Sequence, residues 1–270
     1  MNGAALSYAD LALAGALLLV NGIISVAFGL RLERSLAIAA VRMVVQLAAV
    51  GFALKFVFAQ ASPVWTALLA VAMVVFAGLE LARHDGNRLR GWLAHGLGSG
   101  TLLLVGGAAT LYALLVVIGP EPWHSPRYAL PILGMVLGNV LTSVSLALQT
   151  LGDGVARERA AIDARLALGA SRFAAFRGVL RRSLRTAATP LLNTMAVAGI
   201  VTLPDMMAGQ LLAGADPAEA AKDQIMILFV VSAASALGAL AAALGGVLLL
   251  TDRRHRLRLE RLRAPAREGA

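Results

Sequence analysis

The chain has 270 residues, of which 59% are hydrophobic and only 14% are charged, whereas a typical soluble domain has about 45–50% apolar and about 25% charged residues. Its mean hydropathy of +0.78 excludes a water-soluble globular protein. A helix that crosses a bilayer uses roughly 20 residues, so seven crossings with their loops exclude an additional soluble domain of normal size. The chain contains no cysteine, which excludes disulfides, thiolate metal sites and cysteine nucleophiles.

Seven apolar stretches follow one another along the chain, and each is long enough for a transmembrane helix. The chain is therefore predicted to be an all-α, polytopic membrane protein with seven transmembrane helices. The predicted spans are residues 8–30, 35–59, 63–82, 93–118, 129–151, 187–213 and 224–251.

Basic residues are concentrated in alternate connections between these spans. The connections after the first, third and fifth spans, together with the C-terminal tail, hold 20 of the 24 lysine and arginine residues, and the opposite side holds two. Because loops rich in lysine and arginine stay in the cytoplasm, the N-terminus is predicted to lie outside and the C-terminus in the cytoplasm. The net charge of +9 thus reflects membrane topology, and no nucleic-acid partner is expected.

The C-terminal tail, residues 252–270, is predicted to be a basic cytoplasmic segment. Leu257, Leu259 and Leu262 lie among arginines, which predicts a short basic helix over 253–263. Such a helix binds anionic headgroups, so membrane lipid is its expected partner.

The long polar connection, residues 152–186, is predicted to form an amphipathic elbow of two helices on the cytoplasmic surface. In the first helix, Ile162 and Leu166 are four residues apart and share a face, and Leu168 adds to the apolar surface. Gly169 predicts a left-handed residue that ends this helix.

The second helix of the elbow is expected to begin after Ser171, whose hydroxyl can cap it. Phe173, Phe176 and Leu180 follow at intervals of three and four residues, which places them on one face. Arginines are interspersed with these residues and follow them: Arg177, Arg181, Arg182 and Arg185. Two hypotheses account for the elbow equally well. It lies on lipid headgroups, or it is a docking surface for a soluble partner with Leu166, Leu168 and Gly169 at its tip.

The elbow resembles the cytoplasmic motif of ABC importer permeases, in which an acid and an alanine are followed by a glycine six positions after the acid. Asp163, Ala164 and Gly169 have this spacing, and Val179 supplies the aliphatic residue ten positions after the glycine. Arg165 replaces the second alanine of the motif, and the closing Leu-Pro is absent.

Further segments resemble the FetB type permease family, which was long catalogued as an uncharacterised protein family and is related to plant aluminium-tolerance transporters. The resemblance covers about residues 20–250. Asp205 departs from it, because the family has glycine after the proline. The segments are PILGMVLGN at 131–139, ARLALGA at 164–170 and GIVTLPDMMAGQLLAGADP at 199–217, together with Arg42, Gln46 and Gly51 in the second span.

The resemblance implies one transmembrane permease domain over 1–270 that forms a homodimer and pairs with a separate ATP-binding cassette ATPase subunit in the bacterial inner membrane. It also implies ATP-driven export of a metal ion, with iron as the first candidate. The residues expected to contact the ATPase are Asp163, Ala164, Leu166, Leu168, Gly169 and Ala170. Neither lysine follows a glycine, so the chain has no phosphate-binding loop of its own. Catalytic residues and cofactors are therefore not expected in this chain.

Polar side chains inside the second and third spans are candidates for the substrate path. Arg42 lies seven residues into the second span, where an arginine costs about 2.5–3.5 kcal/mol on insertion scales. Gln46 lies one turn further along the same face, and Glu80 lies near the inner end of the third span. A pair between Arg42 and Glu80 that fixes helix register is one hypothesis, and a gate or substrate path is the other.

The sixth span is predicted to break at Pro204, which lacks a backbone N–H. Near the break, oxygen ligands for a substrate cation come from Asp205, Gln210 and Asn193, and thioethers come from Met195, Met206 and Met207. A kink that only shapes the dimer is the alternative. Asn139, which follows Gly134-x-x-x-Gly138, is open to the same two interpretations, and the glycines favour close helix packing.

The histidines show no metal-ligand spacing and therefore do not define a metal site: His84, His95, His124 and His255. A secondary carrier driven by an ion gradient and an ABC transporter of a nucleotide sugar or other small solute remain as alternative functions. An importer-like coupling elbow leaves the direction of transport open as well.

Overall fold

The computed structural model describes residues 8–60, 62–83, 92–119, 121–252, 256–258 and 261. Apart from turns and two isolated bridges, these residues are helical. The chain divides into two compact units, residues 1–60 and 61–270.

The first unit consists of the helices α1 (Tyr8–Ala27) and α2 (Glu33–Gln60). Ser25 joins them, because its hydroxyl oxygen accepts a hydrogen bond from Leu32 N (2.8 Å) and its hydroxyl donates to Glu33 Oε2 (2.9 Å). The chain reverses between the two helices at Gly29, whose φ of +63° favours glycine.

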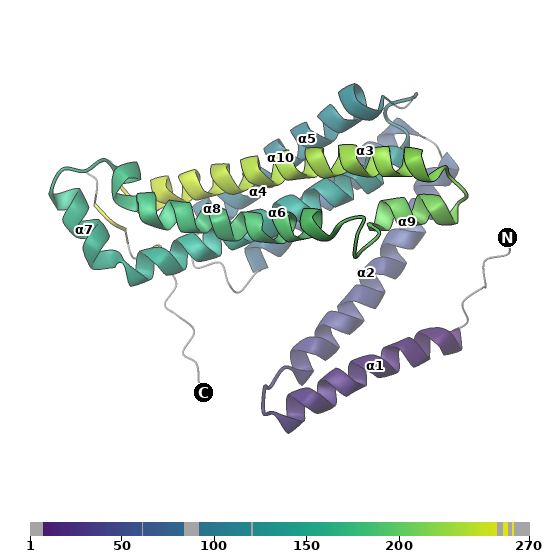
Figure 1. Ribbon diagram of the computed structural model, residues 1–270, viewed down its shortest axis with the longest axis horizontal. Coiled ribbons are helices and arrows are strands. Elements are labelled where there is room, and N and C mark those ends of the chain that lie inside the picture. Colours follow the sequence, from purple (N-terminus) through teal and green to yellow (C-terminus); the bar gives the residue numbers. More distant parts are fainter. Residues whose placement is uncertain are drawn as a thin grey trace. The chain divides into compact units, whose positions relative to one another are not determined.

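The second unit is a helical bundle in which α6 is central. Figure 1 shows α6, α8 and α10 side by side along most of their length, and α3 also packs on α6. A row of α6 residues, Val136, Val140, Val144 and Leu148, is fully buried between these neighbours. The helices are α3 (Pro63–Arg83), α4 (Trp92–Thr101), the π-helical η1 (Leu102–Gly106), α5 (Gly107–Tyr112), the π-helical η2 (Ala113–Ile118), α6 (Pro126–Arg157), α7 (Arg159–Ala167), α8 (Arg172–Val197), α9 (Asp205–Leu212) and α10 (Pro217–Leu250).

Small residues let α6 approach its neighbours closely. A Cβ added at Gly238 of α10 would lie 2.8 Å from Val140 Cγ1, and one added at Gly134 would lie 3.3 Å from Met73 Cε of α3. Gly138 has no atom within 4 Å of such a Cβ, so within the chain the predicted close packing is seen at Gly134 and not at Gly138. Across the α6–α8 contact, the buried Ser183 hydroxyl donates to Ala147 O at 2.6 Å.

Five helices among the described residues are long and apolar enough to cross a membrane, which agrees with a multi-pass membrane protein. The first expected span is represented by a shorter apolar stretch, Gly15–Ala27. The sixth expected span, 187–213, is divided between two helices, which agrees with the predicted break. Its first part continues α8 without interruption from the elbow, and its last part is the separate α9.

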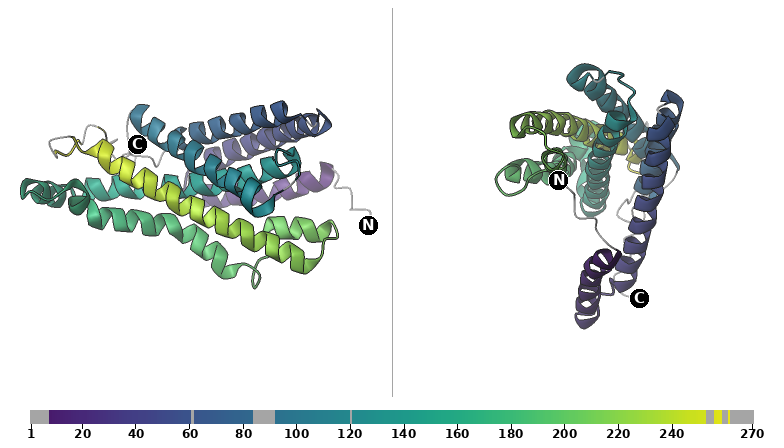
Figure 2. Two further views of the ribbon diagram at one scale, coloured as in Figure 1. Left: turned by 90° about the horizontal axis from the view of Figure 1, so that it is seen from above. Right: turned by 90° about the vertical axis from the view of Figure 1, so that its right-hand side faces the viewer.

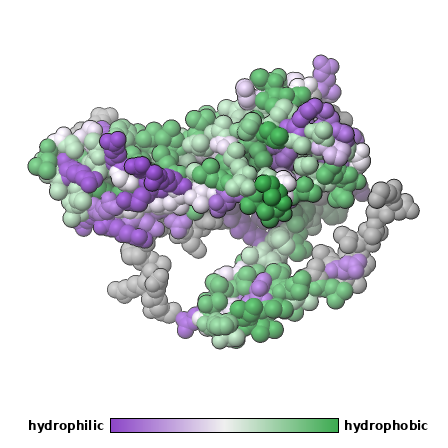
Figure 3. Space-filling view, in the orientation of Figure 1, coloured by the Kyte–Doolittle hydropathy of each residue, from purple (hydrophilic) through white to green (hydrophobic). Residues whose placement is uncertain are grey.

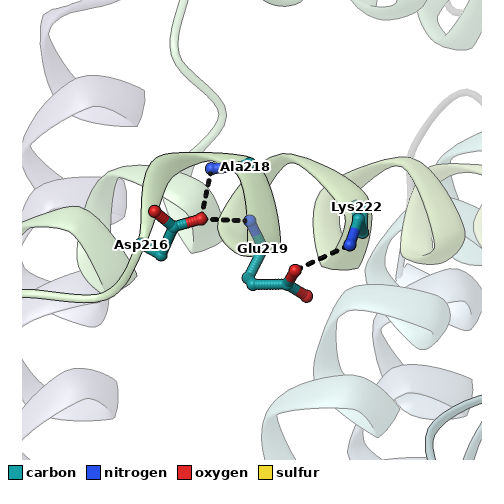
Figure 4. A network of polar contacts seen from close by, with 4 residues as sticks. All are labelled: Asp216, Ala218, Glu219 and Lys222. Atoms are coloured by element: carbon teal, nitrogen blue, oxygen red, sulfur yellow. Dashed lines mark hydrogen bonds and ion pairs between the residues drawn. The ribbon is translucent and has the colours of Figure 1, made fainter.

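Asp216 fixes the start of the long helix α10. Its carboxylate accepts hydrogen bonds from Ala218 N (3.0 Å) and Glu219 N (3.1 Å), and Lys222 Nζ lies 2.6 Å from Glu219 Oε1 (Figure 4). Asp216 therefore satisfies two of the N–H groups that every helix leaves unpaired at its start. Pro217 is the first helical residue, and its fixed φ suits that position. The Asp216 cap and Pro217 together fix where the turn between α9 and α10 ends and α10 begins.

The C-terminal tail departs from its predicted structure where it is described. Leu257 forms an isolated antiparallel bridge with Thr251, and Arg258 N donates to Leu250 O at 2.8 Å, so residues 256–258 fold back on the end of α10. The predicted helix is therefore wrong at these residues. Residues 253–255, 259–260 and 262–270 of the tail, the third connection with Arg88 and Arg90, and His84 lie outside the described residues, and so does the side chain of His95.

Candidate functional site

The turn between α7 and α8 is held by a regular set of backbone hydrogen bonds. Ala170 N donates to Arg165 O and Gly169 N donates to Leu166 O, both at 3.0 Å, which is the Schellman pattern of a helix C-terminus. Gly169 has a φ of +87°, so the predicted left-handed residue is confirmed. Ser171 Oγ accepts a hydrogen bond from Ala174 N at 3.3 Å, which confirms the predicted cap of the next helix.

This turn presents one apolar side chain to the outside. Leu168 is 88% exposed, whereas Ile162 is fully buried and Leu166 packs against the core. The prediction that Leu166 lies at the tip with Leu168 is therefore wrong. Leu166 is two residues from Leu168, and side chains two apart point to different sides of a helix.

The remaining residues of the predicted docking surface lie around this side chain. Ala164 is exposed, Ala170 packs partly against the core, and Asp163 Oδ2 lies 3.8 Å from Arg159 Nε. Leu168 is thus the centre of a short exposed surface on α7 and the following turn. We call this surface, made of Asp163, Ala164, Leu168 and Gly169, the α7–α8 knob.

The knob is attached firmly to the rest of its unit. Arg165 Nη1 donates to Ala175 O at 3.2 Å, and Arg182 forms an ion pair with Glu158 at the start of α7. Phe176 of α8 is fully buried, whereas Phe173, predicted on the same face, is 42% exposed. Hydrophilic residues gather over this end of the unit, at the left of Figure 3, and apolar residues cover most of the remainder.

A pocket of about 430 Å³ lies at the opposite end of α6 and α10 from the knob. It is formed by the beginnings of α6 and α10, the end of η2, and α9, which Figure 2 shows alongside α10. We call it the α6/α9/α10 pocket. Its lining residues are Ile118, Arg127, Tyr128, Pro131, Ile132, Met135, Asp205, Met206, Gln210, Asp223, Met226 and Ile227.

Two glutamines hold α9 against α10 at this pocket. Gln210 Nε2 donates to Asp223 Oδ2 at 2.8 Å, and the buried Gln224 accepts a hydrogen bond from Met207 N at 3.2 Å. A carboxylate oxygen only accepts hydrogen bonds, so the Gln210 atom that faces Asp223 must be the amide nitrogen. The other atom of the amide is therefore the oxygen. That oxygen is buried and has no hydrogen-bond partner within the part of the chain that is described.

The helix break beside the pocket agrees with the sequence. α8 ends at Val197, Gly199 has a φ of +82°, and Pro204 precedes the first residue of α9. Gly199 N donates to Thr202 O at 2.8 Å, which closes a tight turn. Of the residues predicted around the break, Asp205, Met206 and Gln210 line the pocket; Met207 and Pro204 are not among the lining residues.

The other predicted path residues are not among the residues that line this pocket. Arg42 and Gln46 are exposed on one face of α2 in the first unit, and Glu80 is half-buried on α3 in the second. The pair between Arg42 and Glu80 stays a prediction. Asn139 is exposed on α6 and donates to Met135 O at 2.9 Å, and Asn193 is exposed on α8.

Nine of the twelve lining residues were not predicted as site residues, and three of these nine carry a carboxylate or a thioether: Met135, Asp223 and Met226. Each lies in a different sequence segment from Asp205, and no motif connects them. The predicted topology could have indicated these residues, because it places the beginnings of the fifth and seventh spans on the same side of the membrane. Comparing the polar and sulfur-containing residues at those two ends would have selected all three.

A larger groove of about 690 Å³ lies between α10 and the helical segment 104–117. Its lining is apolar except for Tyr112, so it offers almost no groups that bind an ion or a polar solute. The α6/α9/α10 pocket is therefore the better candidate for a solute site.

Comparison with known proteins places the chain among membrane proteins. The profile of the "Uncharacterised protein family (UPF0014)" matches residues 8–248. A UPF0014 membrane protein of Synechocystis is 37% identical over 79% of this chain and 82% of its own length. The Escherichia coli protein named "Probable iron export permease protein FetB" is 32% identical over 97% of this chain and 99% of its own length.

A plant protein is similar as well. The Arabidopsis thaliana protein named "Protein ALUMINUM SENSITIVE 3" is 32% identical over 76% of this chain and 73% of its own length. No solved structure matches the chain.

Proposed function

Since the chain belongs to the UPF0014 family of membrane proteins, we propose that it is the permease subunit of an ATP-driven transporter that exports a metal ion, with iron as the first candidate. The Escherichia coli relative, named as an iron export permease, covers nearly the whole chain and supports the substrate and the direction. The ATP-binding cassette ATPase is a separate subunit in this proposal. The permease crosses the bacterial inner membrane seven times, with its N-terminus outside and its C-terminus in the cytoplasm.

The α7–α8 knob is the observation that carries the ATPase proposal. A leucine that is 88% exposed at the tip of a rigid turn keeps its apolar surface in water. Burial of this side chain in the cleft of a partner would be favourable. The Schellman hydrogen bonds and the Arg165 contact to α8 let the knob transmit a movement of that partner to α8 as a rigid body. The family resemblance of residues 163–170 supports the same role.

The permease forms a homodimer along the exposed face of α6. Gly138, Asn139 and Thr142 are exposed there, near the middle of a helix that is long enough to span the membrane. The Thr142 hydroxyl donates to Gly138 O at 2.9 Å within the helix, so the remaining hydrogen-bonding capacity of the Asn139 amide is what favours helix–helix contact at this depth, and small residues allow a close approach. Asn193 of α8 is exposed too and belongs to the same proposed interface.

Cysteine cross-linking tests this interface directly, because the natural chain has no cysteine. In membranes treated with diamide, Asn139→Cys or Thr142→Cys is expected to yield a disulfide-linked dimer on a non-reducing gel. Leu104→Cys, an exposed position of η1 with apolar neighbours, is the matched control and is expected to stay monomeric. A monomer in all three variants would contradict the interface.

A secondary carrier is the alternative from another class, and the source of energy separates the two. The permease and its ATPase, reconstituted in vesicles, are expected to move iron when ATP is supplied. Transport by the permease alone under a proton gradient would favour the carrier.

A further inference from the structure

We propose that the α6/α9/α10 pocket binds the transported cation and selects a borderline or soft cation over Mg²⁺ and Ca²⁺. The ligands are the carboxylates of Asp205 and Asp223, the amide oxygen of Gln210, and thioethers of methionines from three helices: Met135 of α6, Met206 of α9 and Met226 of α10. This site rests on the proposed transport of a metal ion and goes beyond it by naming the ligands and the selectivity.

The Gln210 oxygen is the first indication of a ligand. It is buried without a hydrogen-bond partner among the described residues, while the amide nitrogen of the same side chain is held by Asp223 at 2.8 Å. A buried acceptor left unpaired costs about 1–3 kcal/mol. A cation in the pocket would remove that cost, because it would be bound by this oxygen and the neighbouring carboxylate together.

The charge of the lining favours a cation over an anion. The lining residues include two aspartates, Asp205 and Asp223, and a single arginine, Arg127. Pro131 adds to this, because it has no N–H for the carbonyl oxygen of Arg127, four residues earlier in α6. An anionic nucleotide sugar would meet a net negative lining, so this pocket does not fit the nucleotide-sugar alternative.

The thioethers determine which cations are selected. Mg²⁺ and Ca²⁺ require oxygen ligands and gain nothing from methionine sulfur, whereas Cu⁺ prefers sulfur and Fe²⁺ accepts mixed ligand sets. Three of the twelve lining residues are methionines, and each comes from a different helix. Methionine is also a common packing residue, and a comparison of Met206 with its neighbour Met207 separates metal binding from packing.

The position of the pocket suits the last binding step of export. Arg127 and Gly154 are 27 residues apart on α6, which corresponds to about 40 Å along the helix. A knob on the cytoplasmic side therefore places the pocket on the far side of a membrane core about 30 Å thick. A cation released from this pocket leaves toward the outside.

Metal binding to the purified full-length permease tests the proposal without ATP or the ATPase. Equilibrium dialysis against Fe²⁺ under anaerobic conditions is expected to show one site per chain, with Mg²⁺ in large excess unable to displace the iron. Asp223→Asn and Met206→Leu are expected to weaken Fe²⁺ binding by about tenfold or more. Met207→Leu is the matched control, because Met207 is adjacent in α9 but is not a lining residue, and its Fe²⁺ affinity is expected to stay within about twofold of the natural chain.

The proposal is overturned if Fe²⁺ binds equally to the natural chain and to both pocket variants, or if Mg²⁺ displaces it at similar concentration. Size-exclusion profiles identify a variant that fails to fold, and if Asp223→Asn does so, Met206→Leu alone decides. Failure of this site is distinguishable from failure of the proposed transporter. Loss of ATPase pairing leaves Fe²⁺ binding unchanged, and a permease that pairs with its ATPase but has no pocket site refutes only the present inference.

Discussion

Leu168→Arg is expected to prevent binding of the ATPase subunit while leaving the permease folded. The side chain is 88% exposed, so its replacement disturbs no packing within the chain. In the proposed complex it fills an apolar cleft, where a central contact residue contributes about 2 kcal/mol or more, equivalent to a loss of affinity of about 30-fold. Co-purification of the tagged permease with its ATPase, quantified on a gel, measures this loss. ATP-driven transport is expected to disappear with it.

Two further variants separate docking from folding. Leu168→Met keeps an apolar side chain of similar volume and is expected to retain the ATPase. Leu166→Arg is expected to lose it for another reason, because Leu166 packs against the core and an arginine there destabilises α7. A lowered unfolding temperature identifies that case. Normal ATPase binding by Leu168→Arg would show that the knob is not the docking surface.

Gly154→Ala is expected to destabilise the contact between α6 and α8. A Cβ at this position would lie 2.5 Å from Val179 Cγ1, inside a fully packed region below the knob. Overpacking of this kind costs typically about 1–3 kcal/mol, which exceeds the roughly 0.5–1 kcal/mol that alanine gains over glycine within a helix. Denaturation of the purified permease by heat or by SDS measures the change in stability.

Gly178→Ala is the matched control for this prediction. It lies next to Val179 in α8, but the nearest atom to its added Cβ is Arg182 Nη1 at 4.0 Å. The substitution is expected to leave stability unchanged or to raise it. Val179→Ala should also relieve part of the cost of Gly154→Ala in the double variant, because it removes the clashing methyl groups. Equal effects of alanine at positions 154 and 178 would contradict the packing argument.

Local sequence patterns predicted the knob and the helix break well. The positions of Gly169 and Ser171 depend on a helix end and a helix start, both of which are encoded by single residues. The break at Pro204 depends on a missing N–H, which is likewise a local property. Features of this kind need no knowledge of which helices pack together.

Features that depend on tertiary packing were predicted less well. The sequence placed the boundary between the elbow and the sixth span near residue 186, after the last arginine of the elbow. In the structure, α8 crosses this boundary and continues to Val197, and its buried Ser183 contacts α6. Whether Leu166 at the end of α7 or Leu168 just after it faces outward depends on the side of the helix that packs on the core, so the sequence did not distinguish these two leucines. The methionine and aspartate residues of the α6/α9/α10 pocket come from segments distant in sequence and meet only in the fold.

The most direct measurement of the central claim is iron transport by the permease reconstituted with its ATPase in vesicles. ATP supplied on the side of the knob is expected to drive iron toward the opposite side, and Leu168→Arg is expected to stop this movement while iron binding persists. Iron movement that is equally fast without ATP, and that instead follows an imposed proton gradient, would contradict the account.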